Sequence, residues 1–77
     1  MSRPPIQDVP IADGPIRLGQ FLKLAGLAED GGHARALLAD GAVRVNGRPE
    51  TRRGAQLAPG DVIAVGALRA RPVGPPG

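Results

Sequence analysis

The residues of this chain that could do chemistry are mainly arginines. Nine of the ten basic residues are Arg, and Lys23 is the single lysine. Four of the arginines fall between positions 44 and 54, where Glu50 is the only acidic residue. A guanidinium group is planar and can donate two parallel hydrogen bonds to one phosphate. The cluster therefore favours a phosphate-rich partner, although a general use of arginine as the surface cation would explain the same composition.

Side chains that act as nucleophiles, bases or metal ligands are scarce. The sequence has no Cys and no Tyr, one His, and a single Ser and Thr at positions 2 and 51. Disulfides and cysteine zinc sites are therefore excluded. His33 has no second His with which to hold a metal, and no Cys or Ser partner to activate. We predict no catalytic residue, no metal site and no cofactor, and we expect that the chain is not an enzyme.

A pair of glycines, Gly31 and Gly32, stands where a helix is expected to begin. Asp30 precedes the pair and is a typical N-cap residue. The first N–H groups of a helix have no partner inside the helix and attract anions, and glycines leave them uncovered. The backbone of residues 31–33 could therefore hold a phosphate. A flexible entry into the helix explains the glycines equally well.

Two helices are expected to position these residues. In residues 16–25, apolar side chains recur at i, i+3, i+4 and i+7, which predicts a helix that ends near Gly26. A second apolar stripe predicts a helix that begins after Asp30 and ends at Gly41. The two stripes consist of Leu18, Phe21, Leu22 and Ala25 in the first helix, and of Ala34, Leu37 and Leu38 in the second.

The second half of the core is expected to be β-structure. Residues 42–45 alternate apolar and polar side chains, and Asn46-Gly47 predicts a type I′ hairpin turn. Residues 48–53 lack this alternation and are interpreted as a solvated arm, whereas 62–65 form a buried strand that 66–71 extend as a fraying end. The predicted fold is α+β, with two packed helices followed by a small antiparallel sheet of three to four strands. Its predicted core is Phe21, Leu22, Leu37, Leu38, Val43, Val45, Leu57 and Ile63.

Glycine and proline concentrate at the two ends of this 77-residue chain. We therefore predict a flexible segment over 1–15, a single domain over 16–71 and a disordered tail over 72–77, with 6–11 able to add an edge strand. No apolar run could cross a bilayer, and the first residues lack the apolar stretch of a secretory signal. We expect a monomeric cytoplasmic protein with no membrane association.

The order of these elements resembles the S-four RNA-binding domain, a family named after small-subunit ribosomal protein four. The stretches RLGQFLKLAGL, GGHARALLADGAVRVNG and LAPGDVIAV carry the resemblance, which covers about residues 16–66. They are similar to the family's Arg-Leu-Asp start, its Ala-Arg-x-Leu helix, its Gly-x-Val-x-Val-Asn-Gly strand and turn, and its closing Gly-Asp-x-Ile. The matching residues are Arg17, Leu18, Ala34, Arg35, Leu37, Leu38, Gly41, Val43, Val45, Asn46, Gly47, Gly60, Asp61 and Ile63.

The chain departs from the family pattern at two places. Gly19 replaces the Asp of the first motif, and Asp30-Gly31 stands where the family usually has Ser-Arg. The glycine pair, together with residues 51–54, resembles a narrower group of short stand-alone bacterial proteins, the YbcJ- and YaaA-like ones. The resemblance implies a ribosome-associated protein whose partner is structured RNA, above all ribosomal RNA. It also implies that bare helix amides and the arginine arm make the contact.

The predicted RNA-binding surface joins the start of the second helix to the hairpin. Arg17 either belongs to this surface or ties the two helices together, and Asn46 is assigned to its turn. Because a duplex is recognised mainly by shape and backbone, we expect weak sequence specificity. The predicted binding residues are Lys23, Gly31, Gly32, His33, Arg35, Arg44, Arg48, Arg52 and Arg53.

Two other functions are alternatives to RNA binding. One is a protein-interaction adaptor without an RNA partner, against which the spread of positive charge argues. The other is a β-grasp sulfur carrier, which the hairpin at 45–47 and the residues 59–63 resemble. Such carriers end in Gly-Gly, whereas this sequence ends in Pro76-Gly77, and two helices precede the hairpin.

Overall fold

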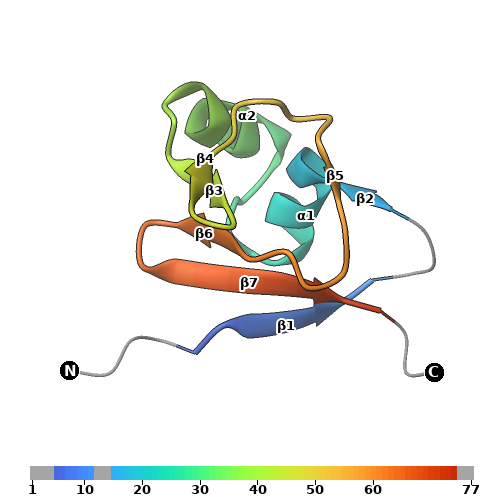
Figure 1. Cartoon of the computed structure of the whole chain (residues 1–77). Coiled ribbons are helices and arrows are strands. Elements are labelled where there is room, and N and C mark those ends of the chain that lie inside the picture. Colours follow the sequence, from blue (N-terminus) through green and yellow to red (C-terminus); the bar gives the residue numbers. More distant parts are fainter. Residues whose placement is uncertain (1–4, 12–14, 75–77) are drawn as a thin grey trace.

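The computed structural model describes residues 5–11 and 15–74. Two helices lie against one side of a strongly twisted sheet, and a second, very short sheet lies beside the first helix (Figure 1). The elements in chain order are β1 (Gln7–Pro10), β2 (Ile16–Arg17), α1 (Leu18–Leu24), α2 (Gly31–Ala39), β3 (Val43–Val45), β4 (Arg48–Pro49), β5 (Gln56–Leu57), β6 (Ile63–Val65) and β7 (Leu68–Val73).

The main sheet has five strands in the order β1-β7-β6-β3-β4, and β2 pairs with β5 in the second sheet. Neighbouring strands are antiparallel except for β1 and β7, which are parallel. The α+β class is therefore confirmed. The predicted order of helices followed by an antiparallel sheet is incomplete, because β1 and β2 precede α1 and one strand pair is parallel.

Both helices begin and end close to where the sequence predicts. The Asp30 side chain accepts a hydrogen bond from the His33 N–H at 2.8 Å, which makes Asp30 the N-cap of α2. Gly26 and Gly41 follow the two helices with φ angles of 75° and 71°. This left-handed backbone suits glycine and stops a helix.

The hairpin between β3 and β4 is the predicted type I′ turn, with φ angles of 53° at Asn46 and 83° at Gly47. Asn46 also does more than shape its own turn. Its Oδ1 accepts from the Val62 N–H at 2.9 Å, and its Nδ2 donates to Asp61 Oδ1 at 3.1 Å. Asp61 in turn accepts from the Ala58 N–H at 2.9 Å. These bonds fix the hairpin to the turn that precedes β6.

The core lies between the helices and the sheet and contains most of the predicted residues. Six of the eight predicted side chains are buried, while Leu37 and Val45 are half-buried and pack against the others. Several further side chains are buried although they are not in the predicted core, because they lie outside the predicted stripes and strands or at their ends. These are Val9, Ile11, Leu18, Ala25, Leu27, Ala28, Ala34 and Ala70.

The segment predicted to be flexible contributes a strand. Val9 and Ile11 are 6% and 8% exposed, and β1 pairs with β7 from Gln7↔Ala70 to Pro10↔Val73. Across this pair the Arg71 Nη2 lies 2.6 Å from Asp8 Oδ1. Alternating apolar residues reach the core here despite the surrounding prolines. The prediction of a flexible segment is therefore wrong for residues 7–11, whereas the edge strand that residues 6–11 were predicted to be able to add is confirmed at 7–10.

The predictions for the C-terminal part are also corrected. Residues 66–71 are not a fraying extension, because Gly66 begins a turn at φ 61° and β7 then runs between β1 and β6. The predicted tail begins too early, since Pro72 is fully buried in β7 and its carbonyl accepts from the Gly60 N–H at 2.9 Å. The remaining parts of these predictions, over 1–4, 12–14 and 75–77, lie outside the described residues.

Candidate nucleic-acid interface

An open cleft of about 400 Å³ lies between the two helices and the loop that follows β4. Three cationic side chains from different parts of the chain line it: Arg17 before α1, Lys23 on α1 and Arg53 in the loop. No Asp or Glu is found among the described residues that line it. The cleft therefore concentrates positive charge and suits an anionic ligand. Its other lining residues are Gly19, Gln20, Gly31, Ala34 and Gly54.

The loop is held against the first turn of α1 by backbone hydrogen bonds. The Leu18 N–H donates to the Ala55 carbonyl at 2.8 Å, and the Gly19 N–H donates to the Arg53 carbonyl at 3.0 Å. These N–H groups have no partner within a helix. Since the loop satisfies them, the Leu18 and Gly19 amides are not available to an anion, and the side chains of Arg17, Lys23 and Arg53 supply the positive charge of this cleft.

The start of α2 differs from the predicted row of bare amides. The His33 N–H is bonded to the Asp30 carboxylate, and His33 Nδ1 accepts from the Glu29 N–H at 3.0 Å. A negative side chain therefore occupies part of the predicted phosphate position, and the prediction is wrong for the His33 amide. The physical reason is the N-cap itself, which uses this amide. Of the glycine pair, only Gly31 lines the cleft.

Arg52 and Arg53 are neighbours in sequence but have different surroundings. Arg52 Nε lies 3.3 Å from Glu50 Oε1, which also accepts the backbone N–H groups of Thr51 and Arg52 at 3.0 Å each. The side-chain hydrogen bond from Arg52 holds the pKa of the Glu50 carboxyl below its usual value. Glu50 is then ionised at neutral pH and offsets the charge of Arg52, whereas Arg53 lines the cleft.

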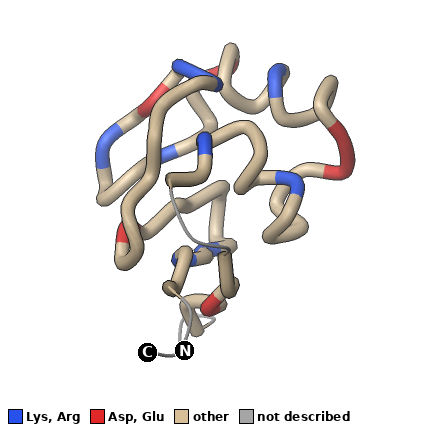
Figure 2. The backbone as a smooth tube through the Cα atoms, turned by 90° about the vertical axis from the view of Figure 1, so that its right-hand side faces the viewer, with Lys and Arg blue, Asp and Glu red and all other residues tan. Residues whose placement is uncertain are grey.

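The hairpin arginines lie apart from the cleft. Arg44 and Arg48 are exposed on β3 and β4, and Arg44 Nη1 donates to the Gly47 carbonyl at 3.3 Å. In the sheet register Arg44 pairs with Ala64, which pairs with Arg69 on β7, so Arg44 shares a row with Arg69. Basic positions are spread over several segments with acidic positions between them (Figure 2). Arg44 and Arg48 are not among the described residues that line the cleft.

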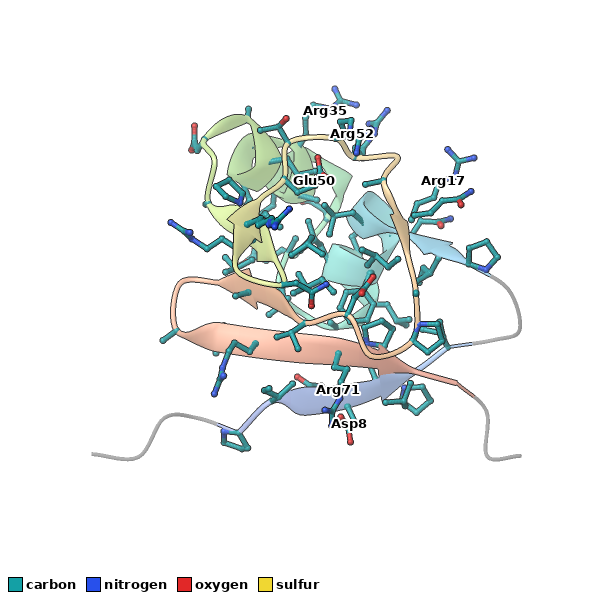
Figure 3. The ribbon with its side chains drawn as sticks, viewed as in Figure 1. Asp8, Arg17, Arg35, Glu50, Arg52 and Arg71 are labelled. Atoms are coloured by element: carbon teal, nitrogen blue, oxygen red, sulfur yellow. The ribbon has the colours of Figure 1, made fainter. Side chains whose placement is uncertain are left out.

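All nine predicted binding residues are exposed, but the cleft includes only three of them: Lys23, Gly31 and Arg53. Arg35 and Arg52 project from the end of the molecule farthest from β1 (Figure 3). Arg17, which the sequence left undecided, projects beside β2 and lines the cleft. The sequence signal for Arg17 is the Arg-Leu pair of the first family motif. That Arg17 and Arg53 line the same cleft follows only from the position of the loop after β4 in the structure.

Arg44→Ala should separate binding from stability. Because the Arg44 side chain is exposed on a strand, its loss should change the free energy of unfolding by no more than about 0.5 kcal/mol. Affinity for a structured RNA should fall modestly. Thermal melts and RNA titrations of the same samples check this. A large drop in melting temperature would show that the Arg44 side chain stabilises the folded sheet, which would contradict its assignment to binding alone.

A family model for the S4 domain matches residues 9–71. The chain belongs to the S4 domain family. The match begins at Val9 on β1 and ends at Arg71 on β7, so it includes part of each strand of the parallel pair. The resemblance identified from the helix, hairpin and Gly-Asp motifs is thereby confirmed.

Two relatives are similar to this S4 domain over most of its length. A protein of Bacillus subtilis (strain 168), named as probable ribosome maturation protein RlbA, is 48% identical over 50 residues, which are 65% of this chain and 70% of the relative. The solution structure of YbcJ from E. coli, reported to reveal an alfaL motif involved in RNA binding, superposes with a TM-score of 0.69 at 26% identity. It covers 95% of this chain and 94% of YbcJ.

The family assignment removes the basis for a sulfur carrier. The hairpin at 45–47 and the turn before β6, on which that interpretation rested, both lie inside the matched S4 region. Among the described residues, neither helix is long and apolar enough to cross a membrane.

Proposed function

We propose that this S4 domain binds structured RNA, with ribosomal RNA as the main partner, and that it acts in ribosome maturation without catalysing a reaction. The observation that carries the proposal is the cleft in which Arg17, Lys23 and Arg53 meet with no acidic residue among its described lining. The names of the two relatives support the same assignment. A monomeric state, the absence of a cofactor and a cytoplasmic setting are parts of the proposal.

The cleft would bind the RNA backbone. Arg17 and Arg53 can each grip a phosphate with two donors, and Lys23 adds a compact charge on the α1 side. Each phosphate that these groups neutralise releases counterions, which makes the affinity depend on salt. Arg44 and Arg48 would extend the contact when a longer RNA passes the hairpin.

The proposed partner is structured RNA because the chain offers no exposed Phe, Tyr or Trp on which unpaired bases could stack. Phe21 is the only residue of these three types, and it is fully buried in the core. Proteins that bind single strands stack bases on exposed aromatic side chains. Recognition through phosphates and shape is the remaining mode, and it gives weak sequence preference.

Sequencing of RNA crosslinked to the protein in cells tests the proposal. Ribosomal RNA should be enriched over total RNA in the crosslinked fraction, and a variant without the three cleft cations should lose this enrichment. Recovery of a stable protein partner without crosslinked RNA would favour the adaptor instead. Enrichment that survives in the cleft variant would place the RNA on another surface.

Gly31→Arg should increase the affinity for RNA. Gly31 lines the cleft, and a Cβ built on it meets nothing within 4 Å, so a longer side chain has room. A fourth cation should steepen the log–log dependence of affinity on salt by about one unit. Gly31→Gln is the matched control, because it adds a similar length without charge and should leave the slope as it is. Equal slopes for both variants would mean that phosphates do not enter this cleft.

A further inference from the structure

Gly19 lies directly beneath the side chain of Arg53. A Cβ built on Gly19 would stand 2.5 Å from Arg53 Cγ and 3.2 Å from Arg53 Cδ. Real Cβ atoms essentially never approach another heavy atom closer than 3.0 Å. The stem of Arg53 therefore occupies the space that the first side-chain atom of any other residue at position 19 would need.

The glycine is not explained by its backbone angles. Gly19 lies within the first turn of α1, and it is not among the glycines of the described chain that have a positive φ. Alanine is the better helix former at such a position. The close approach of Arg53 is therefore the feature of this structure that requires the absence of a side chain.

The backbone of the loop is fixed independently of this contact. The Gly19 N–H donates to the Arg53 carbonyl at 3.0 Å, and the Leu18 N–H donates to the Ala55 carbonyl at 2.8 Å. A new Cβ at position 19 could push the loop away only by breaking these bonds. The Arg53 side chain would have to rotate instead, which would change where its guanidinium lies relative to the cleft that Arg53 lines.

We propose that Gly19 is a positioning residue, which directs the Arg53 guanidinium into the cleft shared with Arg17 and Lys23. This inference rests on the proposed RNA-binding function of the cleft. It assigns no contact between Gly19 and RNA. The aliphatic part of the Arg53 side chain packs against the α-carbon of Gly19, and Arg53 makes the contact with phosphate.

Four proteins test the proposal: the wild type, Gly19→Ala, Arg53→Ala and the double variant. The probe is a labelled RNA hairpin with a stem of about 16 base pairs, the length that a double-stranded RNA-binding domain spans. Affinity is measured by fluorescence anisotropy at several salt concentrations. Gly19→Ala should lower the log–log salt slope by about one unit, as Arg53→Ala does, and the double variant should lose no more than either single one. A wild-type slope in Gly19→Ala, or additive losses in the double variant, would overturn the proposal.

Melting temperatures of the same four proteins, without RNA, test the contact itself. Arg53→Ala removes the Cγ and Cδ atoms with which a Cβ at position 19 would collide. Gly19→Ala in the Arg53→Ala background is therefore the control for Gly19→Ala in the wild type. In the Arg53→Ala background, Gly19→Ala should raise the melting temperature. In the wild-type background the rise should be absent or reversed, and the Arg53 Nε–Hε resonance should shift. Equal rises in both backgrounds with an unchanged resonance would show that Gly19 does not position Arg53.

The two measurements separate failure of the inference from failure of the proposed function. If the wild type does not bind the hairpin, RNA binding by this cleft is refuted, while the melting temperatures still decide whether Gly19 places Arg53. If Gly19→Ala fails to fold but the double variant folds, the collision is demonstrated. If neither folds, position 19 tolerates no side chain for a reason unrelated to Arg53, and the inference is wrong.

Discussion

Replacing Arg17, Lys23 and Arg53 together with Gln should abolish most of the salt-dependent affinity for structured RNA. Each cation that neutralises a phosphate contributes about 0.7 to 0.9 units to the log–log salt slope, so the triple variant should lose about two to three units. Glutamine keeps much of each stem in place, including the part of Arg53 that packs against Gly19. Melting temperature should change little, because none of the three side chains is part of the core.

A second triple variant controls for net charge. Arg35, Arg44 and Arg48 are all exposed and lie outside the cleft. Their replacement with Gln also takes the formal net charge from +3 to 0, since three positive charges are removed in either case. The cleft variant should lose more of the slope than this control. Equal losses would mean that affinity follows net charge and that the cleft is not the binding site. In the otherwise wild-type protein, Arg52→Gln should have a smaller effect than Arg53→Gln, because Glu50 already offsets the charge of Arg52.

Leu38→Ala should leave the domain largely unfolded at 37 °C. Leu38 is 2% exposed in the centre of the core, and removal of such a side chain costs about 2–5 kcal/mol. A single core in a chain of this size rarely supplies more than about 3–5 kcal/mol in total. Circular dichroism melts and urea titrations measure the loss.

Leu24→Ala is the matched control for Leu38→Ala. Leu24 is 56% exposed at the end of α1, so the same truncation should change the free energy of unfolding by no more than about 0.5 kcal/mol. A Leu38→Ala protein as stable as the Leu24→Ala protein would contradict the core described for this fold.

The elements that the sequence predicts correctly are those with a local signal. The stripe that contains Phe21 and Leu22 specifies α1, and Asn46-Gly47 specifies the hairpin, because each pattern depends on neighbouring residues alone. The pairing of β1 with β7 has no such signal. It joins Asp8 to Arg71, and prolines surround both strands, so composition indicated flexibility where the folded chain has a parallel pair.

The candidate site divides in the same way. Exposure of the basic residues follows from their type and from the faces of the helices, and all nine predicted binding residues, six of which are Lys or Arg, are exposed. Their partners depend on how one loop docks. In the turn after β4, the Arg52 side chain pairs with Glu50, whereas Arg53 lines the cleft. The two residues are of the same type, so the sequence alone does not distinguish their surroundings. The cap at His33 could have been deduced, since an N-cap Asp ordinarily takes an amide of the first helical turn.

The parallel pairing of β1 with β7 also sets the order in which the fold can be completed. A ribosome releases the chain from its N-terminus, so β1 emerges first and its partner emerges last of all the strands. Until Val73 has been released, Val9 and Ile11 have no complete sheet to join and remain exposed to solvent. The residues of both helices have been translated by then. Closing so long a loop is slow compared with forming a helix or a hairpin. The main sheet of this protein is therefore completed only after its last strand, β7, has been translated.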